Sequence, residues 1–473
     1  MSNKFYITTT LPYVNADPHI GFAMEILLAD VVARMRRELG DEVFFNTGTD
    51  EHGLKVCRKA EELGKETQIY CDDKSLEYKK LKTCLNLSYD NFIRTTDKQH
   101  IQAAQEFWKL CDKKGDIYKK LYKVKYCVGC ELEKTESELE NGCCPYHPDQ
   151  KLEIIEEENY FFRFSKYQDK LLDLYKNNPD FVYPKKRLNE IAKFIEMGPV
   201  DFSISRLKSK MPWGVPVPDD PEQVIYVWFD ALVNYISAIN WLDDKNNFKK
   251  WWPAVQIAGK DNLRKQSAMW QAMLTSAGLS NSKQIFISGF IGVNGQKMSK
   301  SWGNVISPFE MCDKFGIDGT RYLLLSFGNF GEDIDVSWEK FIEKYNADLA
   351  NGLGNLVSRV IKLAENYDLG IKNYYKTLNL KSEFINLINN METGKALDHI
   401  WTIIRADNKF IEDNKPWELK KNDENKFQAV MKKLIADLYL ISHLLIPLLP
   451  ETAEKIKKAL ADKKTEILFQ RIK

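Results

Sequence analysis

The chain has 473 residues, a formal net charge of +1, 44% hydrophobic residues and 29% charged residues. These values are typical of a globular protein with roughly two to four domains, and they exclude binding to nucleic acid through overall charge alone. No apolar run reaches the roughly 18–20 residues of a membrane span, and the N-terminus has no signal-peptide pattern. We therefore expect a cytoplasmic protein that makes no membrane contact.

The first predicted unit is a strand, a turn, a helix and a second strand. Aromatic and β-branched residues indicate a buried strand at 4–10, followed by a turn at 11–16. A helix is predicted over 17–38, because Asp is a good N-cap and Pro suits the first helical position. With a second strand at 43–47, this is half of a parallel nucleotide-binding unit.

Polar residues stand where such a unit binds ligands. His19 and Gly21 fall in the first predicted helical turn, where free N–H groups and the helix dipole favour phosphate. The segment 48–53 follows the second strand, at the carboxyl edge of the sheet. A lone His at a helix start is more often a cap or a surface residue. These positions therefore indicate a nucleotide site only when they are taken together.

A basic loop lies far downstream, at Lys297-Met298-Ser299-Lys300-Ser301, between glycines. Two lysines and two hydroxyls suit a triphosphate whose leaving pyrophosphate gathers charge in the transition state. The alternative is a solvated surface loop, which is what most charge runs are.

The nine cysteines are unevenly distributed, with Cys127, Cys130, Cys143 and Cys144 within 18 residues and the others scattered. A Cys-x2-Cys pair followed by Cys144-x2-His147 fits a tetrahedral zinc ion held by Cys127, Cys130, Cys144 and His147. Four protein ligands close the coordination shell, so the predicted metal is structural. The other thiols are expected to be reduced, with no disulfide framework.

The remaining pattern continues the α/β alternation. Residues 55–113 have helical periodicity with a short strand near 92–95. Near-continuous apolar runs predict further strands of the parallel sheet at 224–229, 255–261 and 284–288. From residue 346 the chain is helical with short breaks, which predicts a helix bundle.

Three motifs together, His-x-Gly at 19–21, Thr-Asp-Glu-His-Gly at 49–53 and Lys-Met-Ser-Lys-Ser at 297–301, resemble the class I aminoacyl-tRNA synthetases. The resemblance is closest to the bacterial methionyl-tRNA synthetase family and covers nearly the whole chain. It implies an α/β fold in which a split Rossmann-type parallel sheet carries an inserted zinc-knuckle connective domain. An all-α anticodon-binding helix bundle follows. The implied domains are catalytic at 1–114, connective at 115–221, catalytic at 222–306, stem-contact connector at 307–345 and anticodon-binding at 346–473.

The resemblance also implies three sets of site residues. Those expected to act in catalysis are His19, Lys297 and Lys300. Those expected to bind ATP are Asn15, His19, Gly21, Gly259, Asp261, Lys297, Met298, Ser299 and Lys300. Those expected to bind methionine are Leu11, Tyr13, Asp50, Trp228, Ala231, Leu232, Tyr235, Asn262 and Gln266.

The sequence departs from the family pattern in the catalytic domain. Phe22 replaces the second histidine of the His-x-Gly-His motif, which removes one phosphate donor. Asn262 stands where the family has an apolar residue, and Lys265-Gln266 stand where it has Phe-His. The two alternatives that follow are a weakly active tRNA-binding paralogue and an enzyme with another amino-acid specificity.

In the bundle, Asn355 and Arg359 match the Asn-Leu-x-Ser-Arg string that reads the CAU anticodon in the family. Without the resemblance, this polar stripe would be read as a solvated helix face. Trp417 is expected at a structural position, which leaves the residue that stacks on an anticodon base unidentified.

The implied activity is methionine–tRNA ligation, in which ATP and methionine form methionyl-adenylate and pyrophosphate before transfer to tRNA. Expected partners and cofactors are initiator and elongator tRNA(Met), methionine, ATP, Mg²⁺ and structural Zn²⁺. No appended tRNA-binding module is recognised at the end of the chain, so a monomer is expected.

Overall fold

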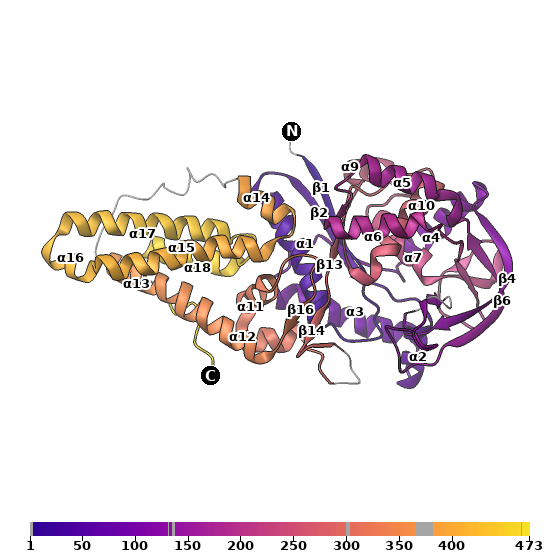
Figure 1. Ribbon diagram of the computed structural model, residues 1–473, viewed down its shortest axis with the longest axis horizontal. Helices are drawn as coiled ribbons and strands as arrows, with labels where there is room; N and C mark the ends of the chain where they lie inside the picture. The colour runs from indigo at the N-terminus through magenta and orange to yellow at the C-terminus, as the bar shows by residue number, and fades with distance from the viewer. Residues whose placement is uncertain (1–2, 131, 135–137, 299–302, 366–381, 465) are drawn as a thin grey trace.

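The computed structural model describes residues 3–473 except 131, 135–137, 299–302, 366–381 and 465. The molecule is elongated, with the helices of the C-terminal bundle at one end and the strands of the inserted region at the other (Figure 1). The N-terminal strand lies near the middle, where the parallel sheet joins the two ends. The chain therefore has the predicted α/β unit, insertion and all-α bundle.

Among the described residues, the central sheet is parallel throughout and has the strand order β3-β2-β1-β12-β13-β7. Its strands are β1 (Lys4–Thr9), β2 (Glu42–Thr49), β3 (Asn91–Arg94), β7 (Val182–Tyr183), β12 (Val255–Gly259) and β13 (Gln284–Ser288). Side chains alternate between faces, since Phe5 and Ile7 pack into one core and Tyr6 into the other. The polar residues that follow β1, β2 and β12 consequently meet at one edge.

Two of the expected sheet assignments are wrong. The run 224–229 is not a strand of the parallel sheet: β11 (Asp220–Ile225) is antiparallel to β9 (Ser205–Leu207) and β10 (Pro216–Val217), and a helix starts at Val227. Conversely, β7 lies inside the range expected for the insertion, yet pairs with β13. Short apolar runs do not reveal their pairing partners, because buried strands and buried helices look alike over six residues.

Helices cover both faces of the central sheet. The helices α1 and α3, with α11 (Pro308–Ser326) from the connector, share one core, and α4 to α10 share the other. The bounds before residue 200 are α1 (Ile20–Glu38), α2 (Leu54–Glu62), α3 (Thr67–Cys84), α4 (Lys98–Lys113), η2 (Phe164–Tyr167), α5 (Gln168–Asn177) and α6 (Lys185–Glu196). The bounds after it are α7 (Val227–Leu232), α8 (Asn234–Ser237), α9 (Lys245–Trp251), η3 (Lys260–Asn262), the π-helix η4 (Lys265–Met269) and α10 (Trp270–Ser276).

The inserted region is built on an antiparallel sheet. Its described strands are β4 (Ile117–Cys127), β5 (Leu132–Lys134), β6 (Glu153–Phe162) and β8 (Phe202–Ser203), in the order β5-β4-β6-β8. The long β4–β6 pair forms the outer end of the molecule (Figure 1). The predicted metal ligands lie where β4 ends and in the connection from β5 to β6.

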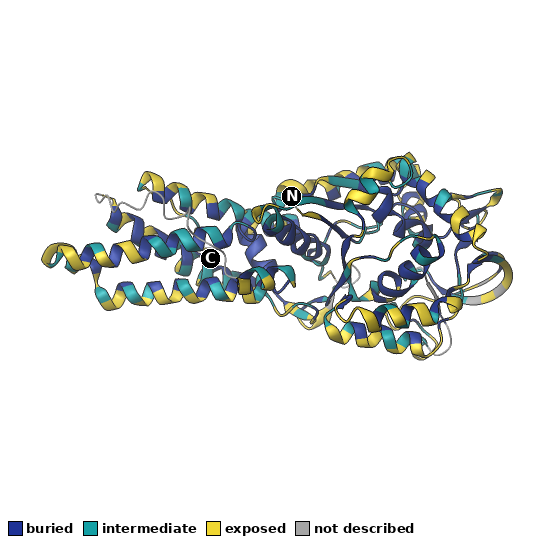
Figure 2. Cartoon of the chain, turned by 90° about the horizontal axis from the view of Figure 1, so that it is seen from above, coloured by how far each residue is buried: buried dark blue, intermediate teal, exposed yellow. Residues whose placement is uncertain are grey.

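The connector links the catalytic sheet to the bundle. It contains α11 (Pro308–Ser326), β16 (Ile334–Val336) and α12 (Trp338–Lys344). Its strand β16 pairs with β14 (Ile291–Val293), which precedes the basic loop and also pairs with β15 (Gln296–Lys297). The bundle follows with the π-helix η6 (Tyr345–Gly354), α13 (Asn355–Ala364), α14 (Ser382–Asn389), α15 (Thr393–Asn414), α16 (Pro416–Asn422), α17 (Glu424–Leu445) and α18 (Pro450–Asp462). Each long helix turns a buried face inward and an exposed face outward (Figure 2). In the described part of the chain, no helix has the length and apolar character needed to cross a bilayer.

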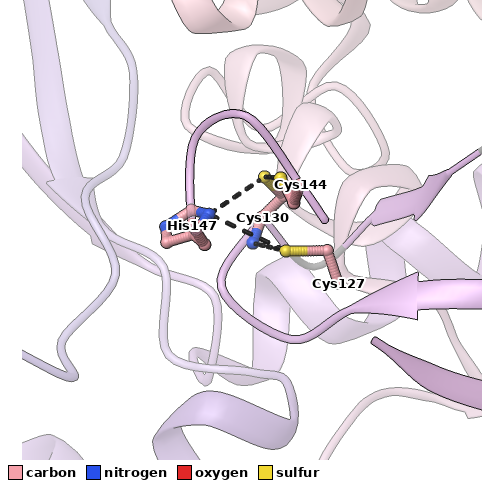
Figure 3. Close-up of side chains that lie close together, drawn as sticks. All are labelled: Cys127, Cys130, Cys144 and His147. Atoms are coloured by element: carbon pink, nitrogen blue, oxygen red, sulfur yellow. Dashed lines mark hydrogen bonds between the residues drawn. The ribbon is translucent and has the colours of Figure 1, made fainter. Parts of the chain in front are cut away.

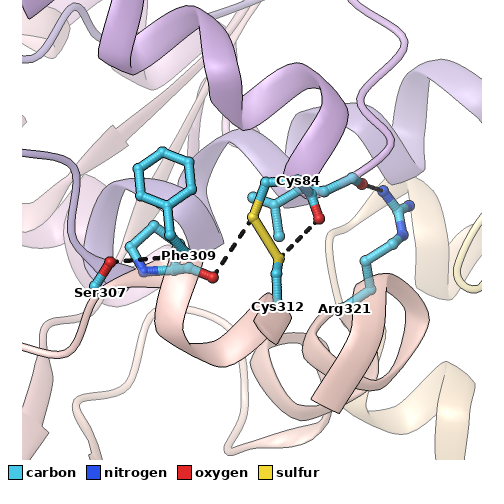
Figure 4. The surroundings of a disulfide bond; sticks show 7 residues. Cys84, Ser307, Phe309, Cys312 and Arg321 are labelled. Atoms are coloured by element: carbon cyan, nitrogen blue, oxygen red, sulfur yellow. Dashed lines mark hydrogen bonds between the residues drawn. A yellow bond between two sulfur atoms is a disulfide. The ribbon is translucent and has the colours of Figure 1, made fainter. Parts of the chain in front are cut away.

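A disulfide joins Cys84, the last residue of α3, to Cys312 in α11 (Figure 4). The expectation of reduced thiols outside the knuckle is wrong for this pair. The two cysteines are 228 positions apart in sequence, and only the packing of α11 against α3 brings their Cα atoms to 6.2 Å. Nothing in their sequence spacing could have indicated the pairing.

Candidate active site

A cavity of about 550 Å³ opens at the carboxyl edge of the parallel sheet. Its volume suits a nucleotide together with a small amino acid. The sequence-predicted residues that line it are Leu11, Tyr13, Asn15, His19, Gly21, Asp50, Trp228, Ala231, Leu232, Tyr235, Gly259, Asp261, Asn262, Gln266 and Met298. Ser299 and Lys300 lie outside the described residues, as does the side chain of Lys297, whose backbone pairs with Gly292.

His19 begins α1 and caps it. Its Nδ1 accepts the N–H of Gly21 at 3.1 Å, and the N–H of Ile20 donates to the carbonyl of Ile306 at 3.1 Å. The predicted helix start at Asp17 is therefore wrong, because that carboxylate pairs with Lys74 of α3 instead. Since Nδ1 is an acceptor, the neutral imidazole carries its proton on Nε2, which remains a donor.

Phe22 fills the position of the missing second histidine with a hydrocarbon wall. Its ring is 8% exposed and packs edge-on against Tyr78, with centroids 5.7 Å apart. The Tyr78 hydroxyl donates to the carbonyl of Ala16 at 3.2 Å. The aromatic pair therefore shapes the wall of the cavity, and His19 is the side chain of the motif that is left to donate at this corner.

Asp50 is held at the end of β2 by the turn after β1. Its N–H donates to the carbonyl of Pro12 at 2.9 Å, and its carbonyl accepts from Val14 at 3.2 Å. The residue is 1% exposed and lines the cavity. A carboxylate so buried, on a backbone fixed from both sides, is suited to hold an ammonium group.

Trp228 reaches the cavity from α7, which a buried polar network fixes in place. Asp230 accepts from His52 at 2.6 Å and from His100 at 2.8 Å. Burial alone would raise the pKa of Asp230, but the two histidines hold it at about 2. The network anchors the helix whose other face presents Trp228, and the Trp228 ring packs edge-on against Tyr13 at 5.7 Å.

Tyr235 and Gln266 line the cavity and form a hydrogen bond with each other. The Gln266 amide donates to the Tyr235 hydroxyl, and both side chains are buried. Burial raises the pKa of Tyr235, so this phenol stays protonated. A neutral hydroxyl beside aromatic rings is compatible with an unbranched thioether side chain.

Glu25 lines the same cavity one helical turn beyond Gly21, and it was not among the residues expected from the sequence. Its carboxyl accepts the Thr10 N–H at 2.8 Å, and burial raises the pKa of Glu25 to about 8. The signal was present, because a glutamate on the apolar face of an amphipathic helix is unusual. We find it between β1 and the loop that carries Asp261.

The predicted metal knuckle is a compact cluster beside the cavity (Figure 3). The ligand atoms of Cys127, Cys130, Cys144 and His147 all lie within 4.8 Å of one another. Tetrahedral zinc places S and N ligands roughly 3.5–3.8 Å apart. Here the Cys130–Cys144 sulfur distance is 3.5 Å, and His147 Nδ1 lies 3.7 Å from the sulfur of Cys127. The donor set therefore fits a zinc ion.

Two neighbours explain the shape of the knuckle. Gly129 is required, because a Cβ there would come within 2.4 Å of the His147 ring. Cys143 stands outside the cluster and exchanges backbone hydrogen bonds with Glu140. His147 also lines the cavity, so the knuckle forms part of its wall.

In the bundle, Asn355 is exposed at the start of α13 and Arg359 lies one turn further, 3.8 Å from Glu412 of α15. Trp417 is 44% exposed on α16, at the far tip of the bundle (Figure 1). The expectation that Trp417 is a structural residue is therefore wrong. Its exposure depends on the sharp turn at Lys415, whose φ of 44° a sequence pattern does not reveal.

Comparison with known proteins gives consistent matches over the chain. A family model described as class I tRNA synthetases (M) matches residues 5–153 and 134–361. A second, described as the anticodon-binding domain of methionyl tRNA ligase, matches residues 372–470.

The similar proteins are methionine–tRNA ligases, also called methionyl-tRNA synthetases. A methionine–tRNA ligase of Thermotoga maritima is 42% identical over 96% of this chain and 74% of its own length. One from a Synechocystis strain is 40% identical over 96% of this chain and 89% of its own length. A solved Mycobacterium tuberculosis methionyl-tRNA synthetase in complex with methionyl-adenylate superposes with a TM-score of 0.90 at 35% identity. That superposition covers 96% of this chain and 93% of the other.

Proposed function

The chain belongs to the bacterial-type, class I methionyl-tRNA synthetases and is a methionine–tRNA ligase, and we propose how its residues divide the reaction. The observation that supports the assignment is the single cavity that gathers the residues after β1, β2 and β12 with those of α1 and α7. Ligands bind at this edge in parallel α/β sheets.

In the first step, a methionine carboxylate oxygen attacks the α-phosphorus of ATP, and pyrophosphate leaves. His19 Nε2 donates to the phosphate oxygens as charge develops on them, and the positive end of the α1 dipole stabilises the same charge. Lys297 and Lys300 neutralise the charge of the triphosphate, and Met298 and Ser299 of the same motif contact the nucleotide. Mg²⁺ bound with ATP would screen the charge of the phosphates.

The adenosine and methionine subsites divide the cavity. Asn15, Gly21, Gly259 and Asp261 bind the nucleotide, with the Asp261 carboxylate placed for a ribose hydroxyl pair. Asp50 holds the methionine ammonium. The side chain lies in a subsite shared by Leu11, Tyr13, Trp228, Ala231, Leu232, Tyr235, Asn262 and Gln266.

Zinc in the knuckle would be held by Cys127, Cys130, Cys144 and His147, with a closed coordination shell and a structural role. It would fix the fold of the connection between β5 and β6. Because His147 also lines the cavity, the metal would stabilise one wall of the active site.

In the second step, a terminal ribose hydroxyl of tRNA attacks the methionyl carbonyl, and AMP leaves. Asn355 and Arg359 read the edges of the anticodon bases, and Trp417 is the exposed ring on which one base stacks. Lys415, Lys420 and Lys421 lie within four positions of Trp417 in sequence and add positive charge for the phosphate backbone to this end of the bundle. Both initiator and elongator tRNA(Met) are substrates of one monomeric, cytoplasmic enzyme, whose domain boundaries are those expected above except that β7 belongs to the catalytic sheet.

We expect Trp417→Ala to lower kcat/KM for methionylation of a CAU-anticodon tRNA roughly tenfold or more, because stacking is worth about 1–3 kcal/mol per base. Methionine-dependent pyrophosphate exchange without tRNA should be unchanged, since the bundle tip is remote from the cavity. The measurement is aminoacylation of CAU and altered-anticodon transcripts at fixed salt.

Trp417→Phe is the matched variant, and it should recover most of the charging because it keeps an aromatic face. Equal charging by wild type and Trp417→Ala would contradict the stacking role. Wild-type charging that ignores the anticodon would contradict anticodon recognition by the bundle altogether.

A further inference from the structure

Lys265 is a buried cation next to the amino-acid subsite. It begins η4, is 6% exposed, and its ammonium lies 3.6 Å from the centroid of the Trp228 ring. Among the described residues, no carboxylate lies within ion-pair distance of this ammonium. Burial lowers the pKa of Lys265 to about 8, and the Asp261 charge opposes that shift. A buried ammonium with no carboxylate in direct contact is costly, so its retention calls for an explanation.

The contacts of Lys265 fix its position over the indole. Its ammonium lies 3.3 Å from Asn262 Oδ1 and 3.5 Å from the carbonyl oxygen of Asp261. These two oxygens tether the cation from the η3 side, and the ring face of Trp228 accepts it from the other. Lys265 does not itself line the cavity, whereas Trp228 and Asn262 do.

The Trp228 ring is thereby held at two places. The cation lies over its face, and Tyr13 packs against it edge-on with centroids 5.7 Å apart. Both aromatic rings are walls of the subsite. Without the cation, the indole would keep the Tyr13 contact and its packing against the cluster that contains Tyr126, Met211 and Tyr226, but its face would lose the charged contact.

We propose that Lys265 is a positioning residue that locks the Trp228 ring and thereby sets the selectivity of the amino-acid subsite for the methionine side chain. The inference rests on the proposed function, because it assigns Trp228 to the methionine subsite. A preformed wall spares methionine the cost of ordering the ring. Amino acids with a longer side chain, such as ethionine, benefit less, because they need the ring displaced.

The test is pyrophosphate exchange by Lys265→Met at varied methionine. We expect the methionine KM to rise roughly tenfold, in line with the strength of a desolvated cation–π contact, with kcat and the ATP KM within about twofold. The ratio of kcat/KM for methionine to that for ethionine should fall by a similar factor. Lys265→Arg keeps a cation over the ring and should remain closer to wild type.

Thermal unfolding separates positioning from packing. Met fills the same space without a buried charge, so Lys265→Met should unfold at the wild-type temperature or above it. Lys283→Met is the matched control: its ammonium lies 5.7 Å from the Phe5 ring at the opposite end of the sheet. That variant should leave every kinetic constant unchanged. In a Trp228→Leu background, Lys265→Met should add less than about twofold.

Three results would overturn the proposal: an unchanged methionine KM in Lys265→Met, an equal loss in the double-mutant background, or a lower unfolding temperature with a matching loss of kcat. A wrong assignment of Trp228 to the methionine subsite would give a different result. In that case Trp228→Leu would have the same methionine KM as the wild type.

Discussion

His19→Asn is expected to slow methionyl-adenylate formation about 100- to 1,000-fold, the loss seen when one donor to a developing oxyanion is removed. Asn is a good N-cap, so its side-chain oxygen can still accept the Gly21 N–H that His19 Nδ1 accepts now. The helix start is kept and the Nε2 donor is lost. Methionine KM should change by less than about threefold, because the interaction develops only in the transition state.

Ser337→Asn is the matched control for this change. Ser337 caps α12 through the N–H of Lys340 and lies outside the cavity, so its replacement tests cap exchange without loss of a donor. Steady-state pyrophosphate exchange measures both variants. If His19→Asn kept the wild-type kcat, the phosphate role of His19 would be refuted, and a rise in methionine KM alone would assign it to ground-state binding.

Arg321→Met is expected to lower the free energy of unfolding by about 3–5 kcal/mol, because it removes one of the two cations that pair with the buried Asp30 carboxylate and leaves buried carbonyls without their donor. Arg321 is fully buried and pairs with Asp30 of α1 at 2.8 Å. It also donates to the carbonyls of Leu85 and Leu448, each at 2.8 Å. One side chain thus joins α1, the end of α3 and the turn before α18 (Figure 4 shows its contact beside the disulfide).

Burial would raise the pKa of Asp30, but Arg321 and Arg34 lower it below its ordinary value. Urea unfolding measures the loss, with Arg58→Met as control. The exposed Arg58–Glu153 pair should contribute no more than about 1 kcal/mol. If Arg321→Met lowered the free energy of unfolding no more than Arg58→Met does, the Arg321–Asp30 ion pair would not be what stabilises the contact of α1 with α11.

The sequence predicted the site better than it predicted the backbone around it. His19, Asp50 and Asp261 follow strands whose carboxyl ends must share an edge, so their meeting in one cavity follows from parallel topology. The metal cluster was predictable for a similar reason, because Cys-x2-Cys and Cys-x2-His spacings restrict the geometry locally.

What sequence reasoning missed depends on long-range packing. Trp228 is on a helix because the Asp230–His52–His100 network, spread over 178 positions, holds α7 there. The Cys84–Cys312 bond and the exposure of Trp417 likewise depend on tertiary contacts and on one left-handed turn. Each of these lies outside the range of a local pattern.

The central claim is that this cavity activates methionine with Phe22 in place of the second signature histidine. Methionine-dependent ATP–pyrophosphate exchange by the purified chain tests it most directly, with norleucine, homocysteine, cysteine and leucine as competitors. We predict robust exchange with methionine and kcat/KM for leucine at least roughly 100-fold lower. A folded protein that binds tRNA yet shows no methionine-dependent exchange, or that prefers another amino acid, would contradict the claim.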